Sequence, residues 1–194
     1  MRILLQKISD TTHRLRLVRD DGDSESIELV SRSFLLHDLL HYAVETNAKL
    51  DQSFWGRLAG GMTLAQLHEA SRKRGCGGAP MPAEAAITEA IVGVLTNVVA
   101  ERATARAAIE GLARLFEVQE RQVPTWFTAD FVQRVEQHMK KLRGEWRALP
   151  YGGEMQLIFP IPADQEAKQA AKSPPRMPGR AGVRLGPLTS SRHR

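Results

Sequence analysis

Residues 13–30 have the sequence HRLRLVRDDGDSESIELV, and their pattern decides the fold class. Leu15 and Leu17 alternate with arginines, which places apolar side chains on one face of a strand and charged side chains on the other. In the Asp-Asp-Gly-Asp run that follows, Gly22 supplies the positive φ that a tight turn requires. Residues 26–30 return to a strand-like pattern. The stretch therefore predicts two antiparallel strands joined by a hairpin.

The neighbouring segments extend this hairpin into a sheet. Residues 2–8 form another strand-like run, and a polar turn at residues 9–12 separates it from the hairpin. Three consecutive strands with short turns are typical of an antiparallel meander. Far along the chain, residues 154–159 follow a Tyr-Gly-Gly turn and predict a fourth strand that returns to the meander. Such a sheet needs helices packed on its apolar face.

The intervening residues have the spacing of amphipathic helices. We expect one helix over residues 34–46 with Ser33 as its N-cap, and a short helix from about residue 54 that Asp51 or Ser53 caps. A third helix should follow Thr63, because Thr63 and Gln66 fit the capping-box pattern.

The segment 83–120 raises the question of one helix or two. A straight helix there would be roughly 55 Å long, which is long for a compact body, so we expect a bend or break near Gly93 or residues 102–104. A last helix is expected over residues 128–149. The prediction is thus an α+β fold, with a small antiparallel sheet of three N-terminal strands and one C-terminal strand packed against a bundle of about five helices.

Composition divides the 194 residues into a body and a tail. Residues 160–194 hold six of the ten prolines and seven Lys/Arg against two acids, without apolar periodicity. A segment of this kind cannot bury enough surface to offset its ordering entropy, so we predict a disordered basic tail. Residues 1–159 form a single domain with 20 basic and 20 acidic residues. Nucleic acid contact is therefore expected only through the tail, and only weakly.

Other features of the sequence point to a bacterial cytoplasmic protein. Cys76 is the single cysteine and has no internal disulfide partner, which is typical of a reducing compartment. The N-terminus lacks the apolar core of a signal peptide, and the most apolar stretch, residues 90–100, is too short to span a membrane. Arginine outnumbers lysine 20 to 7, as is common in proteins from high-GC bacterial genomes.

One group of residues in the sequence carries chemistry. Residues 34–45 read FLLHDLLHYAVE, and on a helical wheel His37, His41 and Glu45 fall at about 0°, 40° and 80°, with Asp38 at about 100°. Apolar residues fill the opposite arc. The helix should therefore present a narrow stripe of four ionisable side chains.

Two histidines four residues apart can both reach one metal ion, because their Cβ atoms lie about 5–6 Å apart on a helix. The string His-Asp-x-x-His at residues 37–41 resembles the zincin metallopeptidase motif His-Glu-x-x-His over these five residues. The resemblance implies that His37 and His41 are zinc ligands and that Asp38 stands where the general base stands. Asp is shorter than Glu by a methylene, which shortens its reach to a metal-bound water.

The remaining partners of such a metal site are less defined. Glu45 lies about 12 Å along the helix from His37 and cannot share its ion, but it can orient His41 from behind. A third ligand must come from another segment, where Glu69 is nearest in sequence and Glu84 and Glu89 are equally open. Zinc or another divalent metal is the cofactor under this interpretation alone. The competing interpretation is a polar helix face whose histidines pair with nearby carboxylates or line an edge of the sheet.

No complete catalytic motif accompanies this stripe. The sequence lacks a serine-nucleophile motif, a Walker loop, a dinucleotide fingerprint and a cysteine cluster, and Cys76 in a Gly-rich loop offers only a candidate reactive thiol. The apolar arcs of the helices exceed what a four-stranded sheet can cover. The leading prediction is therefore a non-catalytic binding or regulatory module that acts through helix-mediated protein interaction or self-association. The alternative is a metal-dependent hydrolase-like protein using the His-Asp-x-x-His site.

Overall fold

The computed structural model describes residues 1–74 and 81–160. The predicted tail from residue 161 onward and the loop with Cys76 lie outside these residues. Four strands form one antiparallel sheet in the order β3-β2-β1-β4, which confirms the predicted meander with the C-terminal strand added beside the first. The strands are β1 (Arg2–Lys7), β2 (Thr12–Val18), β3 (Ser24–Val30) and β4 (Glu154–Ile158).

The register of the sheet places apolar side chains on one face. Leu5 lies between Leu15 of β2 and Met155 of β4, and all three side chains are buried. On the opposite face, Arg14 pairs with Glu28 at 2.6 Å in an exposed position. The alternation read from the sequence thus separates a core face from a solvated face.

Six helices are present in the described part of the chain, and they complete the predicted α+β fold. They are α1 (Ser31–Ala48), α2 (Phe54–Ala59), α3 (Leu64–Arg74), α4 (Ala83–Val99), α5 (Ala105–Val118) and α6 (Ala129–Ala148). The long segment from residue 83 is two helices. It breaks at Glu101, which has a φ of 58°, and Thr104 caps α5 by accepting a hydrogen bond from Ala107 N at 3.2 Å. Gly93, the other expected break, lies inside α4.

The start of α1 and the capping of α2 differ from the prediction. α1 begins at Ser31 rather than at Phe34, because β3 runs directly into it and Ser31 N donates a hydrogen bond to Thr11 O at 2.8 Å. Its N-cap is Val30, which makes no side-chain cap. Ser53 is the N-cap of α2 but likewise makes no side-chain hydrogen bond to the helix. The predicted capping box between Thr63 and Gln66 is confirmed.

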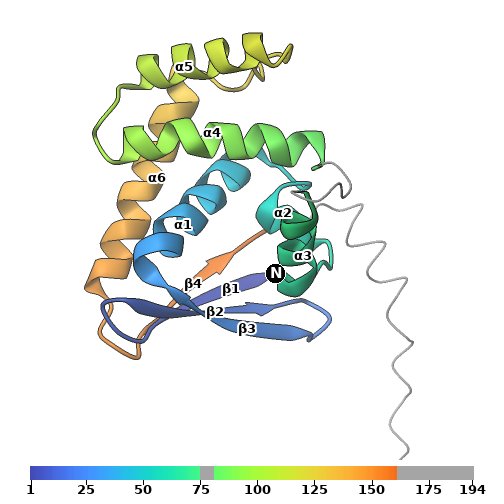
Figure 1. Cartoon of the computed structure of the whole chain (residues 1–194). Helices are drawn as coiled ribbons and strands as arrows, with labels where there is room; N and C mark the ends of the chain where they lie inside the picture. The colour runs from blue at the N-terminus through green and yellow to red at the C-terminus, as the bar shows by residue number, and fades with distance from the viewer. Residues whose placement is uncertain (75–80, 161–194) are drawn as a thin grey trace, which may run out of the picture.

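The helices lie on one face of the sheet (Figure 1). α1 packs over the sheet, α6 runs beside α1, α4 crosses above α1, and α5 is the outermost helix. The buried core includes Leu5, Leu15, Leu39, Leu95 and Phe131. This cover does not extend fully over β3, where the inward-facing Ile27 is 43% exposed. None of the described helices is long and apolar enough to cross a membrane.

Candidate metal centre and adjoining cavity

The ionisable stripe of α1 faces the protein interior for most of its length. Asp38, His41 and Glu45 are buried, with 6%, 1% and 0% of their surfaces exposed, whereas the side chain of His37 is 48% exposed. A solvated polar face therefore does not describe three of the four residues. Burial of charged groups is costly unless each has a partner, so the contacts of this stripe need to be accounted for one by one.

Glu45 connects α1 to α2. Its Oε1 atom lies 3.1 Å from Nδ1 of His41, and its Oε2 atom accepts hydrogen bonds from the backbone N–H groups of Trp55 and Gly56 at 2.8 and 3.1 Å. The carboxylate thus performs the capping role expected of Ser53, whose hydroxyl is buried without a partner among the described residues. A favourable charge at a helix start and three hydrogen bonds offset the burial of this carboxylate.

The backbone of α2 approaches the preceding loop very closely. A Cβ atom at Gly56 would lie 2.4 Å from the backbone of Asp51, so glycine is required at this position. Trp55 also donates a hydrogen bond from Nε1 to the carbonyl oxygen of Asp38 at 3.0 Å. These contacts fix α2 against the polar stripe of α1.

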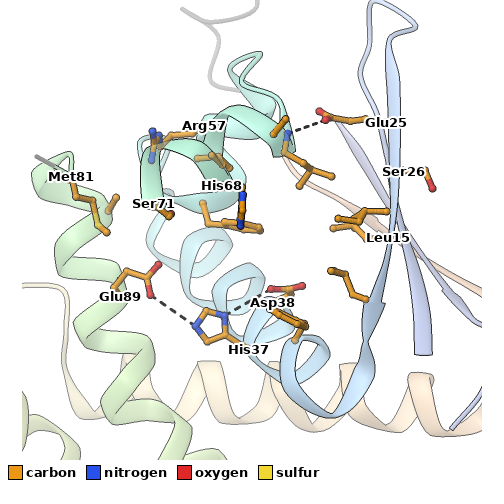
Figure 2. A pocket seen from close by; sticks show the side chains of 18 residues that line it. Leu15, Glu25, Ser26, His37, Asp38, Arg57, His68, Ser71, Met81 and Glu89 are labelled. Atoms are coloured by element: carbon orange, nitrogen blue, oxygen red, sulfur yellow. Dashed lines mark hydrogen bonds and ion pairs between the residues drawn. The ribbon is translucent and has the colours of Figure 1, made fainter. Parts of the chain in front are cut away.

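Glu89 of α4 approaches both histidines from the other side. Its Oε2 atom lies 3.5 Å from Nε2 of His41 and 3.9 Å from Nε2 of His37. Nδ1 of His37 is turned toward Asp38, with 3.8 Å between Nδ1 and Oδ1, as Figure 2 shows. Each histidine therefore directs Nε2 at Glu89 and Nδ1 at an acid on its own helix.

The charge on His41 depends on these carboxylates. Burial by itself lowers the pKa of the imidazole, but Glu45 and then Glu89 outweigh it and raise the pKa to about 9. Nε2 of His41 is fully buried and has no hydrogen bond of good geometry among the described residues, although it lies at ion-pair distance from Glu89. His41 and Glu45 form a buried ion pair, and the half-exposed Glu89 approaches Nε2 of His41 from the side on which a metal ion would lie.

The distances suit a small divalent cation. His37, His41 and Glu89 each offer one ligand atom, and these atoms all lie within 4.8 Å of one another. Zinc with tetrahedral bonds of about 2.0–2.1 Å holds its ligand atoms about 3.3 Å apart. The separations within 4.8 Å exceed that spacing by at most about 1.5 Å, and side-chain rotation at the half-exposed His37 and Glu89 would close the difference.

The other acids considered from the sequence lie in different contacts. Glu69 forms a bidentate pair with Arg72 on α3, at 2.9 and 3.0 Å. Glu84, one turn before Thr88 on α4, accepts a hydrogen bond from the backbone of Gln52. The structure therefore groups Glu89 with the histidines rather than Glu69. No local pattern could select it, because the choice depends on where α4 crosses α1.

A cavity of about 690 Å³ adjoins the metal candidates, and nothing in the sequence indicated it. His37, Asp38 and Glu89 contribute to one wall, while α2, α3 and the inner face of β3 form the others (Figure 2). Its surface is largely apolar, with side chains that include Leu15, Ile27, Leu29, Phe34, Phe54 and Leu67. The space exists because the helices leave the inner face of β3 uncovered.

An ion pair attaches the wall of the cavity that α3 forms to the sheet. Arg19 pairs with Glu25 of β3 and donates a hydrogen bond to the carbonyl oxygen of Met62 at 2.8 Å. Glu25 in turn accepts one from the backbone of Leu64 at 2.9 Å. The start of α3 is thus held at the edge of the sheet, which keeps the cavity open between them.

Comparisons with protein-family models, with curated proteins and with solved structures found no significant match to this chain.

Proposed function

We propose that this chain is a metal-binding protein that holds one divalent ion, of the zinc class, between His37 and His41 of α1 and Glu89 of α4. The position of Glu89 carries the proposal, because a carboxylate oxygen within 4 Å of Nε2 on both histidines completes a set of three ligands. The sequence favours a binding module over a metal site, because it does not identify a third ligand. With Glu89 as the third ligand, we place the metal site first.

The surroundings of the histidines support the same conclusion. Metal-binding histidines commonly donate their second ring N–H to a carboxylate, which fixes the tautomer and the ring orientation. Glu45 stands in this position for His41 at 3.1 Å, and Asp38 stands more loosely for His37 at 3.8 Å. A simple ion pair between His41 and Glu89 would not require a second carboxylate beside Nδ1 of each histidine.

The ligand set also suggests what kind of metal site this is. Two histidines and one glutamate leave the fourth zinc position open, as in catalytic zinc sites. His37 and Glu89 line the cavity, so we place the open position on the cavity side. A zinc ion held there supplies Lewis acidity and activates water toward a carbonyl group. Asp38, the candidate general base, lies beside Nδ1 of His37, and we assign it the positioning of that ring.

Titration calorimetry tests the proposal. We expect the untagged, chelator-treated full chain to bind about one zinc ion, and His37→Ala to weaken binding by at least about a hundredfold. His68→Ala is the matched control, because His68 is an exposed histidine that lines the same cavity from α3 but lies outside the ligand set. Absence of zinc binding, or equal losses in the two variants, would contradict the proposal.

The second candidate function is the non-catalytic binding or regulatory module that acts through protein interaction. Ile27, Val30 and Phe34 support it, because their exposed fractions are 43%, 51% and 47% at the junction of β3 and α1. Sedimentation of the chain and of Ile27→Ser/Phe34→Ser tests it. A concentration-dependent dimer that the variant lacks would favour this function, and a monomer in both cases would count against self-association.

A further inference from the structure

We infer that the cavity beside the metal ligands binds a small organic acid, with a metal-coordinating head group and an apolar alkyl or aryl body. This inference rests on the proposed function and names the ligand class for the same site. The head group would occupy the open position of the ion held by His37, His41 and Glu89. The body would extend from there toward the uncovered inner face of β3.

The size of the cavity suits a small molecule. Its volume of about 690 Å³ is within the range of about 300–1,000 Å³ typical of pockets for drug-sized ligands. Strands β2 and β3 and helices α1 to α4 supply its walls, and the hydrogen bonds of Arg19, Glu25 and Glu45 hold α2 and α3 in place. The cavity is therefore built by the fold and does not depend on a single side-chain position.

The polar side chains of the cavity are grouped on one wall, and the other walls are mainly apolar. Ile27 and Leu29 face inward from β3, Phe34 and Phe54 extend from α1 and α2, and Leu67 lies on α3. His37, Asp38 and Glu89 are grouped on the wall where α1 meets α4 (Figure 2). A pocket with apolar walls and a few convergent polar groups fixes a ligand by its polar end and accepts an apolar body.

The metal selects the head group. A divalent ion held by two neutral imidazoles and the Glu89 carboxylate has an open coordination position that an oxygen ligand fills, whereas without the ion Asp38 and Glu89 on this wall would repel an anion. A carboxylate or hydroxamate meets this requirement and places its chain in the cavity. A cationic head group would instead compete with the metal for Asp38 and Glu89, the two acids at this wall.

A series of alkyl hydroxamates of increasing length, from acetohydroxamate to octanohydroxamate, tests the inference on the zinc-loaded full chain. Calorimetry should show affinity rising about fourfold per methylene while the chain remains inside the cavity, as expected for burial of apolar surface. Ala65→Phe provides the matched variant. Ala65 lines the cavity from α3 in an exposed position away from the metal ligands, so a larger side chain there fills space without disturbing the site.

We expect Ala65→Phe to bind zinc with unchanged affinity, to bind acetohydroxamate normally and to lose at least tenfold in affinity for octanohydroxamate. If zinc binds but affinity does not vary with chain length, the ligand class is wrong and the metal site stands. If zinc itself fails to bind to the wild-type chain, the proposed function fails and the inference with it.

Discussion

Two buried histidines in different regions of this molecule make an instructive pair. His13 lies in the sheet on β2 and His41 lies on α1, and 0% and 1% of their surfaces are exposed. In both, Nε2 is buried without a hydrogen bond among the described residues. Burial nevertheless lowers the pKa of His13, whereas two carboxylates raise the pKa of His41.

His13 has a neutral neighbourhood. Its Nδ1 atom lies 3.1 Å from the hydroxyl of Ser31, and its ring meets the edge of Trp146 with 6.0 Å between centroids. Burial lowers the pKa of His13, and the more distant charge of Asp38 only partly opposes this. We therefore regard His13 as a neutral packing residue of the core.

His41 differs because two carboxylates reach it. Glu45 and Glu89 outweigh the effect of burial and raise the pKa to about 9. Burial alone therefore does not distinguish the roles of His13 and His41. The number of acids at the ring nitrogens does distinguish them. Of these two acids, Glu89 also completes the ligand set proposed for His37 and His41.

The largest expected effect comes from removing the charge behind His41. Glu45→Gln should lower the free energy of unfolding of the metal-free chain by about 3–5 kcal/mol, because it breaks a buried pair and weakens the cap of α2. Glu28→Gln, in an exposed pair with Arg14, is the control and should cost less than about 1 kcal/mol. If the two variants unfold at the same urea concentration, Glu45 does not stabilise the fold in the way proposed.

Zinc should produce the next largest effect on the free energy of unfolding. It should act through the region of His41 and not through that of His13. At a free concentration about 100 times its Kd, zinc should add about 2.7 kcal/mol to the free energy of unfolding. His13→Gln should retain this gain and His37→Ala should lose it. Thermal melts with and without zinc measure both, and a gain that survives in His37→Ala would place the metal elsewhere.

The sequence predicts what depends on short spacings. The alternation around Leu15 and Leu17 and the turn at Gly22 are sufficient for the meander, since strands and hairpins are specified locally. The separation of four residues likewise brings Glu45 to His41 within one helix. The break at Glu101 could be anticipated only as one of two places, because neither Gly93 nor residues 102–104 is a strict helix breaker.

Features that depend on tertiary packing were not predictable in this way. Glu89 belongs with His37 only because α4 crosses α1 at that turn, and Glu69 and Glu84 had equal standing beforehand. The cavity depends on which strand the helices leave uncovered, and Ile27 reads as an ordinary inward-facing strand residue. α1 starts three residues earlier than expected because a strand leads straight into it without a side-chain cap.

A smaller effect should distinguish His13 by its pH dependence. The folded pKa of His13 lies below its ordinary value of 6.5, so the unfolded chain binds the proton more readily. Stability should therefore be full above pH 6.5 and fall as the pH drops through 6.5 toward the folded pKa. His13→Gln should show a shallower fall between pH 8 and 5 in urea titrations. His138 also has a pKa lowered by burial, but it is present in both proteins and cancels in the comparison.

The smallest expected effect concerns His37 in the absence of metal. Its side chain is 48% exposed and its distances to Asp38 and Glu89 are 3.8 and 3.9 Å, so these contacts are weak in water. His37→Ala should change the free energy of unfolding of the metal-free chain by less than about 0.5 kcal/mol. The same substitution is expected to abolish the gain from zinc. A residue that contributes almost nothing to the fold and nearly everything to metal binding is placed for function, whereas a large loss of stability would make His37 a structural residue like His13.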